Sequence, residues 1–257
     1  MNNYLITIQY DGLAHKGWQR LADTDNTVQA VIESALSSIT KSDIRITGSG
    51  RTDAGVSAYA QCANFTCNAE INETHLHDIN LLLPDTIRIT SICKVPSSFH
   101  SRKSCKSKTY MYRIALTSKP DVFMAKYLYN PVNAPLSLSY NCMDNINIDL
   151  DAMRNAADML TGTMDYSAFT SDKSPDKLKI RTITDIDIHI DGQIMSISVT
   201  GNGFLYNMVR IICGTLLEAG LHRIDCRTIS QAVSTGDRTL AGCTLPSNGL
   251  ILVKCVY

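Results

Sequence analysis

The sequence predicts an α+β protein in which one order of secondary-structure elements occurs twice. Short segments alternate apolar and polar residues as strands do, other segments carry a helical apolar stripe, and both halves of the chain arrange them as β-α-β-β-α-β. This order is typical of a ferredoxin-like unit, in which two helices cover one face of an antiparallel sheet. We therefore expect two such units, residues 1–100 and residues 101–257, with their sheets joined edge to edge and an active-site cleft between them.

In the first half, residues 4–10 alternate as a strand, and residues 29–40 place their apolar residues on one side, as a helix does. A short strand into Gly48, a strand at 57–66, a helix at 72–83 and a strand at 87–95 follow. Asn72 is a suitable N-cap for the second helix, and Pro84 ends it.

In the second half, a strand is expected at 108–116 and a helix at 150–160, capped by Asp149 or Asn147. Residues 180–190 and 194–200 alternate around Asp191-Gly192, which is a strong hairpin signal. Helices at 205–219 and 228–234 and a strand at 250–256 follow.

Composition favours a packed protein of the reducing cytoplasm. The chain has 257 residues, is 44% hydrophobic and has no net charge. No segment approaches the roughly 20 apolar residues of a membrane helix, and the first residues read as a strand rather than a secretory signal. The nine cysteines are odd in number and widely spaced, so we expect mostly small buried thiols. No metal is expected, since His75 and His77 lack partners at metal-ligand spacing.

The stretch GSGRTDAGVSA, residues 48–58, is the first candidate for a site. A dinucleotide fingerprint would need glycine where Asp53 stands, and a Walker A loop would need lysine where Val56 stands. Two interpretations remain open: Asp53 caps a simple turn, or a glycine-shaped backbone holds Asp53 out as a reagent.

A second candidate is GNGFLYNMVRIICGTLLEAG, residues 201–220, which begins as a turn and continues as a helix. Arg210 lies among apolar residues of this helix, where a guanidinium is costly unless it is paired. Asp53 would be a suitable partner, and the salt bridge would keep the acid ionised. The alternative is an exposed arginine at the helix edge.

Basic residues gather in HSRKSCKSKTYMYR, residues 100–113, which has five Lys or Arg residues and no acid. Such a segment is either a solvated face or a strip that contacts phosphates. We predict phosphate contacts by Arg102, Lys103, Lys106 and Lys108. The next candidates are Lys173, Lys177, Lys179 and Arg181.

These motifs, together with YDGLAHKGWQR, LTGTMDYSAF and LPSNGLILVKCVY, occur in the order expected of the TruA family of tRNA pseudouridine synthases, which the chain resembles nearly end to end. The resemblance implies an isomerase that converts uridine to pseudouridine in the tRNA anticodon stem-loop, at positions 38–40. It implies a homodimer without metal or organic cofactor. It also implies that Asp53 is the catalytic nucleophile and Arg210 its salt-bridge partner, that Tyr110 stacks on the uracil with a possible role in proton transfer, and that Arg51 acts in base flipping.

The chain departs from the family pattern at Ser57, at Met164-Asp165-Tyr166 and at Leu245, where histidine, His-Asp-Phe and alanine are more usual. These departures concern fine substrate contacts. The rival hypothesis is a catalytically inactive RNA-binding protein of the same fold, because ferredoxin-like sheets with aromatic residues also bind single strands. Such a protein would have no reason to keep both Asp53 and Arg210.

Overall fold

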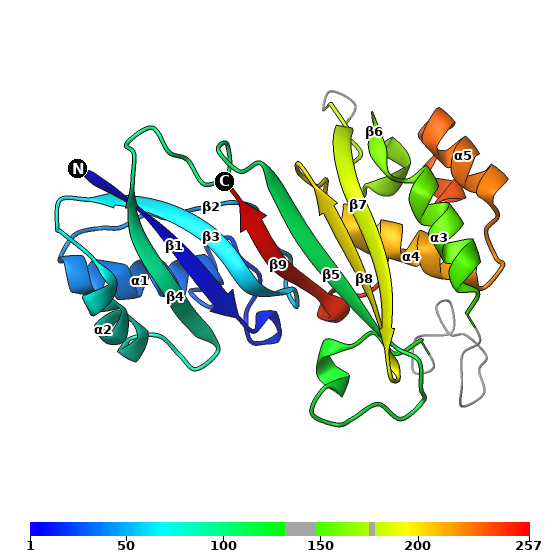
Figure 1. Cartoon of the computed structure of the whole chain (residues 1–257). Helices are drawn as coiled ribbons and strands as arrows, with labels where there is room; N and C mark the ends of the chain where they lie inside the picture. The colour runs from blue at the N-terminus through cyan, green and yellow to red at the C-terminus, as the bar shows by residue number, and fades with distance from the viewer. Residues whose placement is uncertain (132–147, 175–177) are drawn as a thin grey trace. The chain divides into compact units, whose positions relative to one another are not determined.

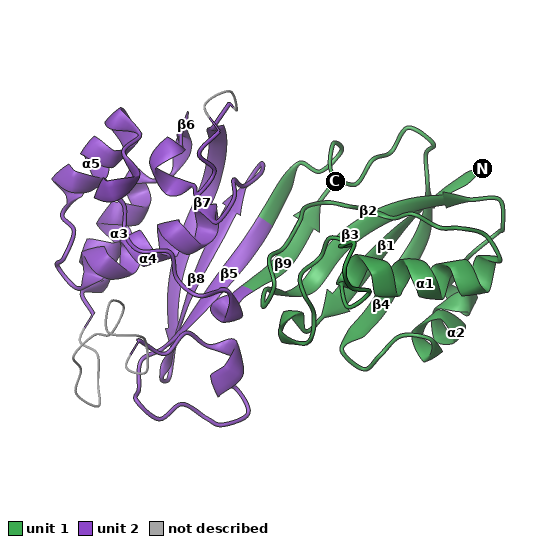
Figure 2. Ribbon diagram, turned by 180° about the vertical axis from the view of Figure 1, so that it is seen from behind, with its two compact units in different colours: residues 1–108, 251–257 green, residues 109–250 purple. Residues whose placement is uncertain are grey.

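The computed structural model describes residues 1–131, 148–174 and 178–257, which form two compact units (Figure 2). Unit 1 comprises residues 1–108 and 251–257, and unit 2 comprises residues 109–250. The sequence predicts a division after residue 100, with the C-terminal strand in the second unit. In the structure the last strand belongs to unit 1, because it pairs with a strand of that unit.

Unit 1 is built on a mostly antiparallel sheet (Figure 1). Strand β1 pairs antiparallel with β3 on one side and with β4 on the other, and the short β2 also pairs with β3. Strand β9 pairs with β3 in parallel, with Ser57 opposite Ile251. The bounds are β1 (Asn2–Tyr10), β2 (Thr47–Gly48), β3 (Ser57–Cys67), β4 (Ile87–Val95) and β9 (Leu250–Val256).

Two helices, α1 (Val28–Thr40) and α2 (Leu76–Leu81), cover one face of this sheet (Figure 2). The Thr27 side chain caps α1 by accepting from the Ala30 amide, and Ile32 and Leu36 carry the apolar stripe into the core. The predicted cap Asn72 is confirmed, but it opens a short 3₁₀ turn (Glu73–His75) before α2, so the regular helix is shorter than predicted.

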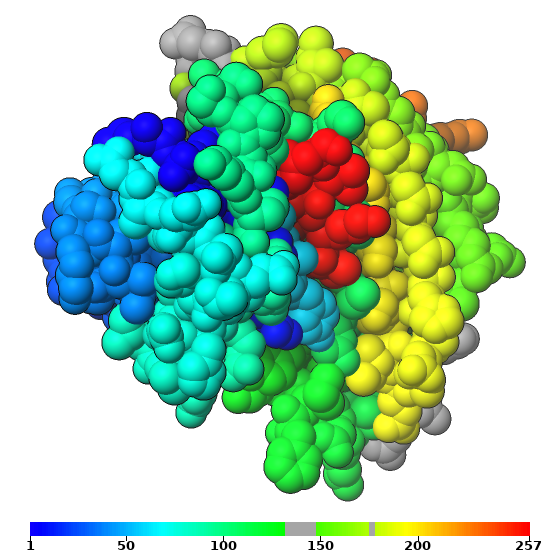
Figure 3. All heavy atoms as spheres, turned by 60° about the vertical axis from the view of Figure 1, so that its left-hand side comes forward, coloured from blue at the N-terminus to red at the C-terminus, as the bar shows by residue number. Residues whose placement is uncertain are grey.

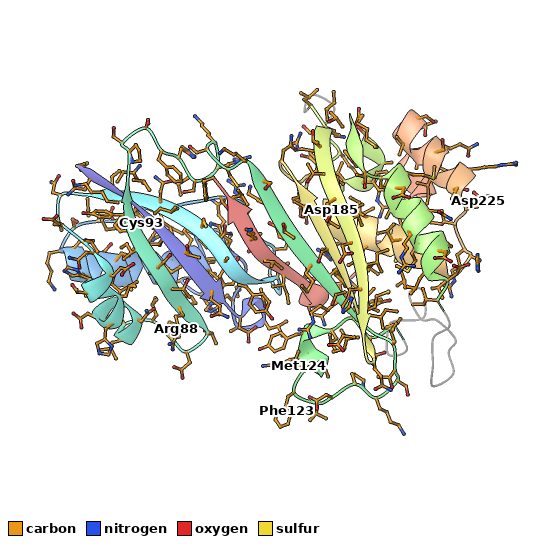
Figure 4. All side chains as sticks on the ribbon, in the orientation of Figure 1. Arg88, Cys93, Phe123, Met124, Asp185 and Asp225 are labelled. Carbon is orange, nitrogen blue, oxygen red and sulfur yellow. The ribbon has the colours of Figure 1, made fainter. Side chains whose placement is uncertain are left out.

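Among its described residues, unit 2 contains strands in the order β5-β8-β7-β6 and the helices α3, α4 and α5. The hairpin predicted at Asp191-Gly192 is confirmed, and the Asp149 side chain caps α3 as predicted, while Asn147 lies outside the described residues. Asp225 caps α5 in the same way (Figure 4). The bounds are β5 (Ser107–Ala115), β6 (Gly162–Asp165), β7 (Ile180–Asp191), β8 (Ile194–Gly201), α3 (Leu150–Met159), α4 (Met208–Gly220) and α5 (Cys226–Thr235).

Helix α4 begins three residues later than predicted. Asn207 has a left-handed backbone with φ 61°, so Leu205–Asn207 form a turn and Met208 is the first helical residue. Arg210 therefore lies in the first turn of α4 instead of the second. Helical apolar spacing continues through such a turn, which is why the pattern alone placed the start too early.

Strand β6 was not predicted from the sequence, because its four residues are too few to show alternation. With β6 added to unit 2 and β9 paired in unit 1, the structure shows an α+β fold with mostly antiparallel sheets. Single-turn 3₁₀ helices complete the described elements: η1 (Gly12–Ala14), η2 (Glu73–His75), η3 (Ala125–Tyr127), η5 (Ser167–Phe169), η6 (Arg238–Leu240) and η7 (Ser247–Gly249).

Within the described residues, no helix has the length and apolar character needed to cross a membrane. The segment before η3, green in Figure 3, exposes Val122 and Phe123 at the surface of unit 2, and Figure 4 labels Phe123. The prediction that most cysteines are buried is only partly right. Cys62, Cys67 and Cys213 are buried, but Cys226 is exposed, and so is Cys93, because it lies on the outward face of β4 (Figure 4). Cys142 lies outside the described residues.

Candidate active site

The segment between β2 and β3, residues 49–56, is held in place by hydrogen bonds to its backbone. The Ser49 amide donates to Cys62 O at 2.7 Å, and Gly50 O accepts from the Gln61 side-chain amide at 3.0 Å. Thr52 O accepts from the Trp18 amide at 3.0 Å. We call this segment the Asp53 loop. Its shape is set by hydrogen bonds to its surroundings, so it is more than a chain reversal.

The Asp53 loop ends in a tight turn. The Val56 amide donates to Asp53 O at 3.1 Å, and Gly55, the third residue of the turn, has φ 86°. A type II turn requires positive φ at this place, which is why glycine stands there. Asp53 is thus the first residue of a rigid turn.

Close packing explains the other glycines around the loop. A Cβ on Gly48 would lie 2.7 Å from the Trp18 ring, and one on Gly12 would lie 2.0 Å from Val56 O. Gly17, at φ 89°, approaches the backbone of Thr52 and Ala54. The motif YDGLAHKGWQR therefore packs against the Asp53 loop, a contact that the sequence alone does not show.

Side chains alternate in exposure along the loop. Arg51 is exposed, Thr52 is buried and Asp53 is partly exposed. The Thr52 hydroxyl lies 2.7 Å from the Tyr10 hydroxyl, and burial raises the pKa of Tyr10 well above its usual range, so Tyr10 stays neutral. Thr52 is thus fixed in the interior, while Arg51 and Asp53 on either side of it keep exposed surface.

The basic segment divides into two parts. Arg102, Lys103 and Lys106 are exposed, and the turn that carries the first two is tied to the Asp53 loop's entry strand by the Ser101 hydroxyl, which donates to Thr47 O at 2.8 Å. Lys108 differs: it is only 9% exposed, and its ammonium donates to Ser49 O at 2.6 Å. Its charge is therefore turned toward the Asp53 loop and away from solvent, contrary to what a phosphate contact needs.

In unit 2, Tyr110 lies on β5 and is 7% exposed. Its ring meets Phe204 edge to face, with the centroids 5.3 Å apart. Two residues on, Tyr112 is fully buried, its hydroxyl donates to Pro246 O at 2.7 Å, and burial holds its pKa well above the usual range. Tyr112 is therefore a neutral core residue, while Tyr110 keeps a small exposed area.

Arg210 is clamped within unit 2. Its Nε donates to Leu245 O at 2.6 Å, and its Nη1 donates to Asn207 Oδ1 at 2.7 Å. These two bonds fix the plane of the guanidinium, so the left-handed Asn207 both starts α4 and orients Arg210. The alternative of an arginine loosely exposed at the helix edge does not fit this arrangement.

The second basic group is less suited to phosphates. Lys173 is exposed, but Arg181 Nη1 donates to two carbonyls of its own chain, Leu178 O at 3.2 Å and Ile180 O at 2.6 Å. Lys179 is partly exposed, and Lys177 lies outside the described residues. Within the described part of the chain, no group of three or more His, Cys, Asp or Glu residues could hold a metal ion.

Each unit thus contributes its own predicted residues: Arg51, Asp53 and the basic segment in unit 1, and Tyr110 and Arg210 in unit 2. Sequence reasoning missed Ser49, Gln61 and Asn207. Gln61 gives no signal, since a buried glutamine in a strand resembles any polar residue. Asn207 could have been found, because asparagine is one of the few residues that tolerate positive φ before a helix.

Similarity to known proteins identifies the family of the chain. A model of the family described as tRNA pseudouridine synthase matches residues 6–102 and 156–257, which include Arg51, Asp53, Arg102 and Arg210. Lys103, Lys106, Lys108 and Tyr110 fall between the two matched segments.

Relatives align over almost their whole length. A Bacillus cereus protein named tRNA pseudouridine synthase A 2 is 38% identical over 253 residues, which is 98% of each chain. A Clostridium tetani protein of the same name is 39% identical over 257 residues, covering 99% of this chain and 98% of its own. An Acetivibrio thermocellus protein named tRNA pseudouridine synthase A is 36% identical over 258 residues, the full length of both. Because the family model matches most of the chain and these relatives align over almost all of it, the chain belongs to the tRNA pseudouridine synthases, a family of isomerases.

Proposed function

We propose that this protein isomerises uridine to pseudouridine at positions 38–40 of the tRNA anticodon stem-loop, with Asp53 as the nucleophile. The observation that carries the proposal is the Asp53 loop: a hydrogen-bonded backbone in which Thr52 is buried, Arg51 is exposed and Asp53 is partly exposed. Enzymes need a reacting group held in one position, and a rigid turn supplies this.

The reaction breaks the N1–C1′ bond of uridine, rotates the base and forms a C5–C1′ bond. C5 loses its proton and N1 gains one, so nothing is oxidised or consumed, and we propose that no cofactor takes part. The base must first leave its stack, at a cost of a few kcal/mol. We assign this step to Arg51, stacking of the uracil to Tyr110, and formation of the temporary bond to Asp53.

The site needs both units. We propose two ferredoxin-like halves joined edge to edge, with the active site in the cleft between them and a salt bridge from Arg210 to Asp53. The support is chemical: a guanidinium clamped by Asn207 and Leu245 is oriented in advance, and a fixed cation keeps a facing carboxylate ionised. We further propose a cytoplasmic homodimer.

For docking, we propose that Arg102, Lys103 and Lys106 contact tRNA phosphates. All three are exposed; Arg102 and Lys103 lie on a turn tied to the entry of the Asp53 loop, and Lys106 follows this turn, directly before β5. Phosphate contacts fix register and orientation without selecting the base, so this strip would bring a stem-loop to the site and leave the choice of uridine to the pocket.

The test is Asp53→Asn, assayed by tritium release from tRNA that carries 5-tritiated uridine. Asparagine keeps the turn but removes the charge, so we expect turnover to fall by about 10⁴-fold, the scale on which a triad carboxylate acts, with tRNA affinity little changed. Asp43→Asn is the matched control, because Asp43 is exposed and outside the loop.

Turnover of the Asp53→Asn protein within about tenfold of wild type would exclude Asp53 as the nucleophile. Tight tRNA binding by a wild-type protein that releases no tritium would instead support the rival function, an RNA-binding protein without catalysis.

A further inference from the structure

Lys108 is a buried lysine without an acidic partner. It lies on β5 with 9% of its surface exposed, although lysine is almost never this buried unless it is paired. Within the described part of the chain, its ammonium has one hydrogen-bond partner, Ser49 O at 2.6 Å, and no carboxylate. Burying this charge costs desolvation free energy, so we expect a structural role of Lys108 other than keeping the protein soluble.

Its partner, Ser49, is the point at which the Asp53 loop is fastened. Ser49 is fully buried, its amide donates to Cys62 O at 2.7 Å, and its hydroxyl donates to Gln61 Oε1 at 2.7 Å. The same hydroxyl lies 3.2 Å from Cys255 Sγ. With the bond from Lys108, every polar atom of Ser49 has a partner. All four partner residues lie on strands: Cys62 and Gln61 on β3, Cys255 on β9 and Lys108 on β5.

The Lys108 bond controls one peptide plane in particular. The carbonyl it holds belongs to the peptide between Ser49 and Gly50, and glycine allows that plane to rotate more freely than any other residue would. Gln61 holds the next carbonyl, Gly50 O, at 3.0 Å. Together the two donors fix consecutive carbonyls, and the chain then reaches Arg51 and Asp53 in a defined direction.

We propose that Lys108 is a positioning residue for Asp53, acting through the Ser49 carbonyl, and does not contact tRNA phosphate. The inference rests on the proposed role of Asp53 and adds a residue that the loop requires. The spacing K-x-Y-x-Y supports it, because residues two apart on a strand share a face, and Tyr110 and Tyr112 on that face are buried as well.

The two roles predict opposite kinetics, so Lys108→Met and Lys106→Met are compared. Methionine fills the space of the lysine stem and removes the donor. For Lys108→Met we expect kcat for tritium release to fall roughly 10- to 100-fold, as for a small misplacement of a reacting group, with the KM for tRNA and the salt dependence of binding unchanged. For Lys106→Met, which removes a proposed phosphate contact, we expect a higher KM for tRNA and a salt slope that falls by about 0.7–0.9.

A spectroscopic measurement accompanies the kinetics. The Gly50 amide belongs to the peptide whose carbonyl Lys108 binds, so in ¹⁵N-glycine-labelled protein the Gly50 resonance should move in Lys108→Met and stay in place in Lys106→Met. All assays run well below the melting temperature of each variant. If Lys108→Met does not fold, Lys108→Arg is used: it keeps the charge, but its longer planar head cannot donate without shifting Ser49 O, so we expect lower kcat at an unchanged salt slope.

Unchanged kcat with an unmoved Gly50 resonance, or a reduced salt slope at normal kcat, would overturn the assignment of Lys108. In the Arg variant, wild-type kcat would do the same. Asp53→Asn in the same assay distinguishes a wrong role for Lys108 from a wrong proposed function. If Asp53→Asn is inactive and Lys108→Met is fully active, only the role of Lys108 is wrong.

Discussion

Asp53 and its neighbours show how single residues divide the work in the loop. Thr52 turns inward to Tyr10, with the two hydroxyls 2.7 Å apart, while Arg51 is exposed and Asp53 is partly exposed. Gly55 supplies the positive φ of the turn, and Trp18 and Gln61 hold carbonyls on either side of Arg51. In the proposed role of nucleophile, an aspartate held in this way would need little reorganisation.

Arg210 carries the residue-scale prediction. Arg210→Met keeps an unbranched side chain but removes the cation clamped between Leu245 O and Asn207. We expect turnover to fall by roughly 10²- to 10³-fold, the loss seen when one preorganised group is removed from a site. Tritium release measures it, with Arg227→Met as control, because Arg227 is exposed on α5.

The double variant Asp53→Asn, Arg210→Met tests the proposed salt bridge. Residues that act as a unit are not additive, so the pair should be no worse than Asp53→Asn alone. Additive losses would show that the two residues act independently.

Among the elements, helix α1 is tied to the strand that enters the site. Glu33 is buried on α1 and accepts from the Ile46 amide at 2.9 Å and from Gln29 Nε2 at 3.1 Å. It also pairs with Arg20, whose Nε lies 3.0 Å away, and with Arg45 at 3.3 Å. One carboxylate thus joins the helix, the segment before it and the approach to β2.

Glu33→Ala should therefore destabilise the fold. The change leaves the buried Ile46 amide without its acceptor, which costs about 1–3 kcal/mol, while Arg20 and Arg45 can turn to solvent. Urea unfolding should show a lower midpoint at an unchanged m-value. The control is Glu73→Ala, because Glu73 is exposed and its loss should stay within about 0.5 kcal/mol. Equal midpoints for the two variants would show that the Glu33 cluster adds no stability.

At the scale of the whole molecule, charge is uneven although the net charge is zero. Residues 100–182 hold twelve Lys or Arg and eight Asp or Glu. Within the basic segment, residues 100–113, only a few of the basic residues are exposed. Affinity for a polyanion should therefore depend on a small number of phosphate contacts and weaken with salt on a shallow slope.

Changing Lys103 and Lys106 together to Ala should lower that slope by roughly one to two, since each neutralised phosphate contributes about 0.7–0.9. The choice of uridine should stay the same, because phosphate contacts do not specify bases. Filter binding across a salt series measures the slope, and mapping of pseudouridine in the product tRNA measures the choice. An unchanged slope would mean that the phosphate contacts are made by Lys173, Lys177 and Lys179 instead. A changed choice of uridine would mean that the segment recognises the target base directly.

The sequence determined the regular elements well, because alternation, apolar stripes and caps are local properties: the Asp191-Gly192 hairpin, the Asn72 and Asp149 caps and strand β4 are where the pattern predicts them. It also determined the family, because long motifs keep their residues and their order. It failed at β6, which is too short to show a period, and at the start of α4, where a left-handed asparagine interrupts the helix without interrupting the apolar spacing.

Only the tertiary structure decided what each polar residue of the site faces. Lys108 belongs by composition to a basic strip with Lys103 and Lys106, yet it is buried against Ser49, and its period-two relation to two tyrosines was the one local sign of this. Strand β9 reads like any closing strand, yet its parallel pairing with β3 places it in unit 1. Both outcomes depend on contacts between segments that are far apart in the chain. Residue type and spacing indicate which helices and strands can form, but they do not indicate which distant segment each one contacts.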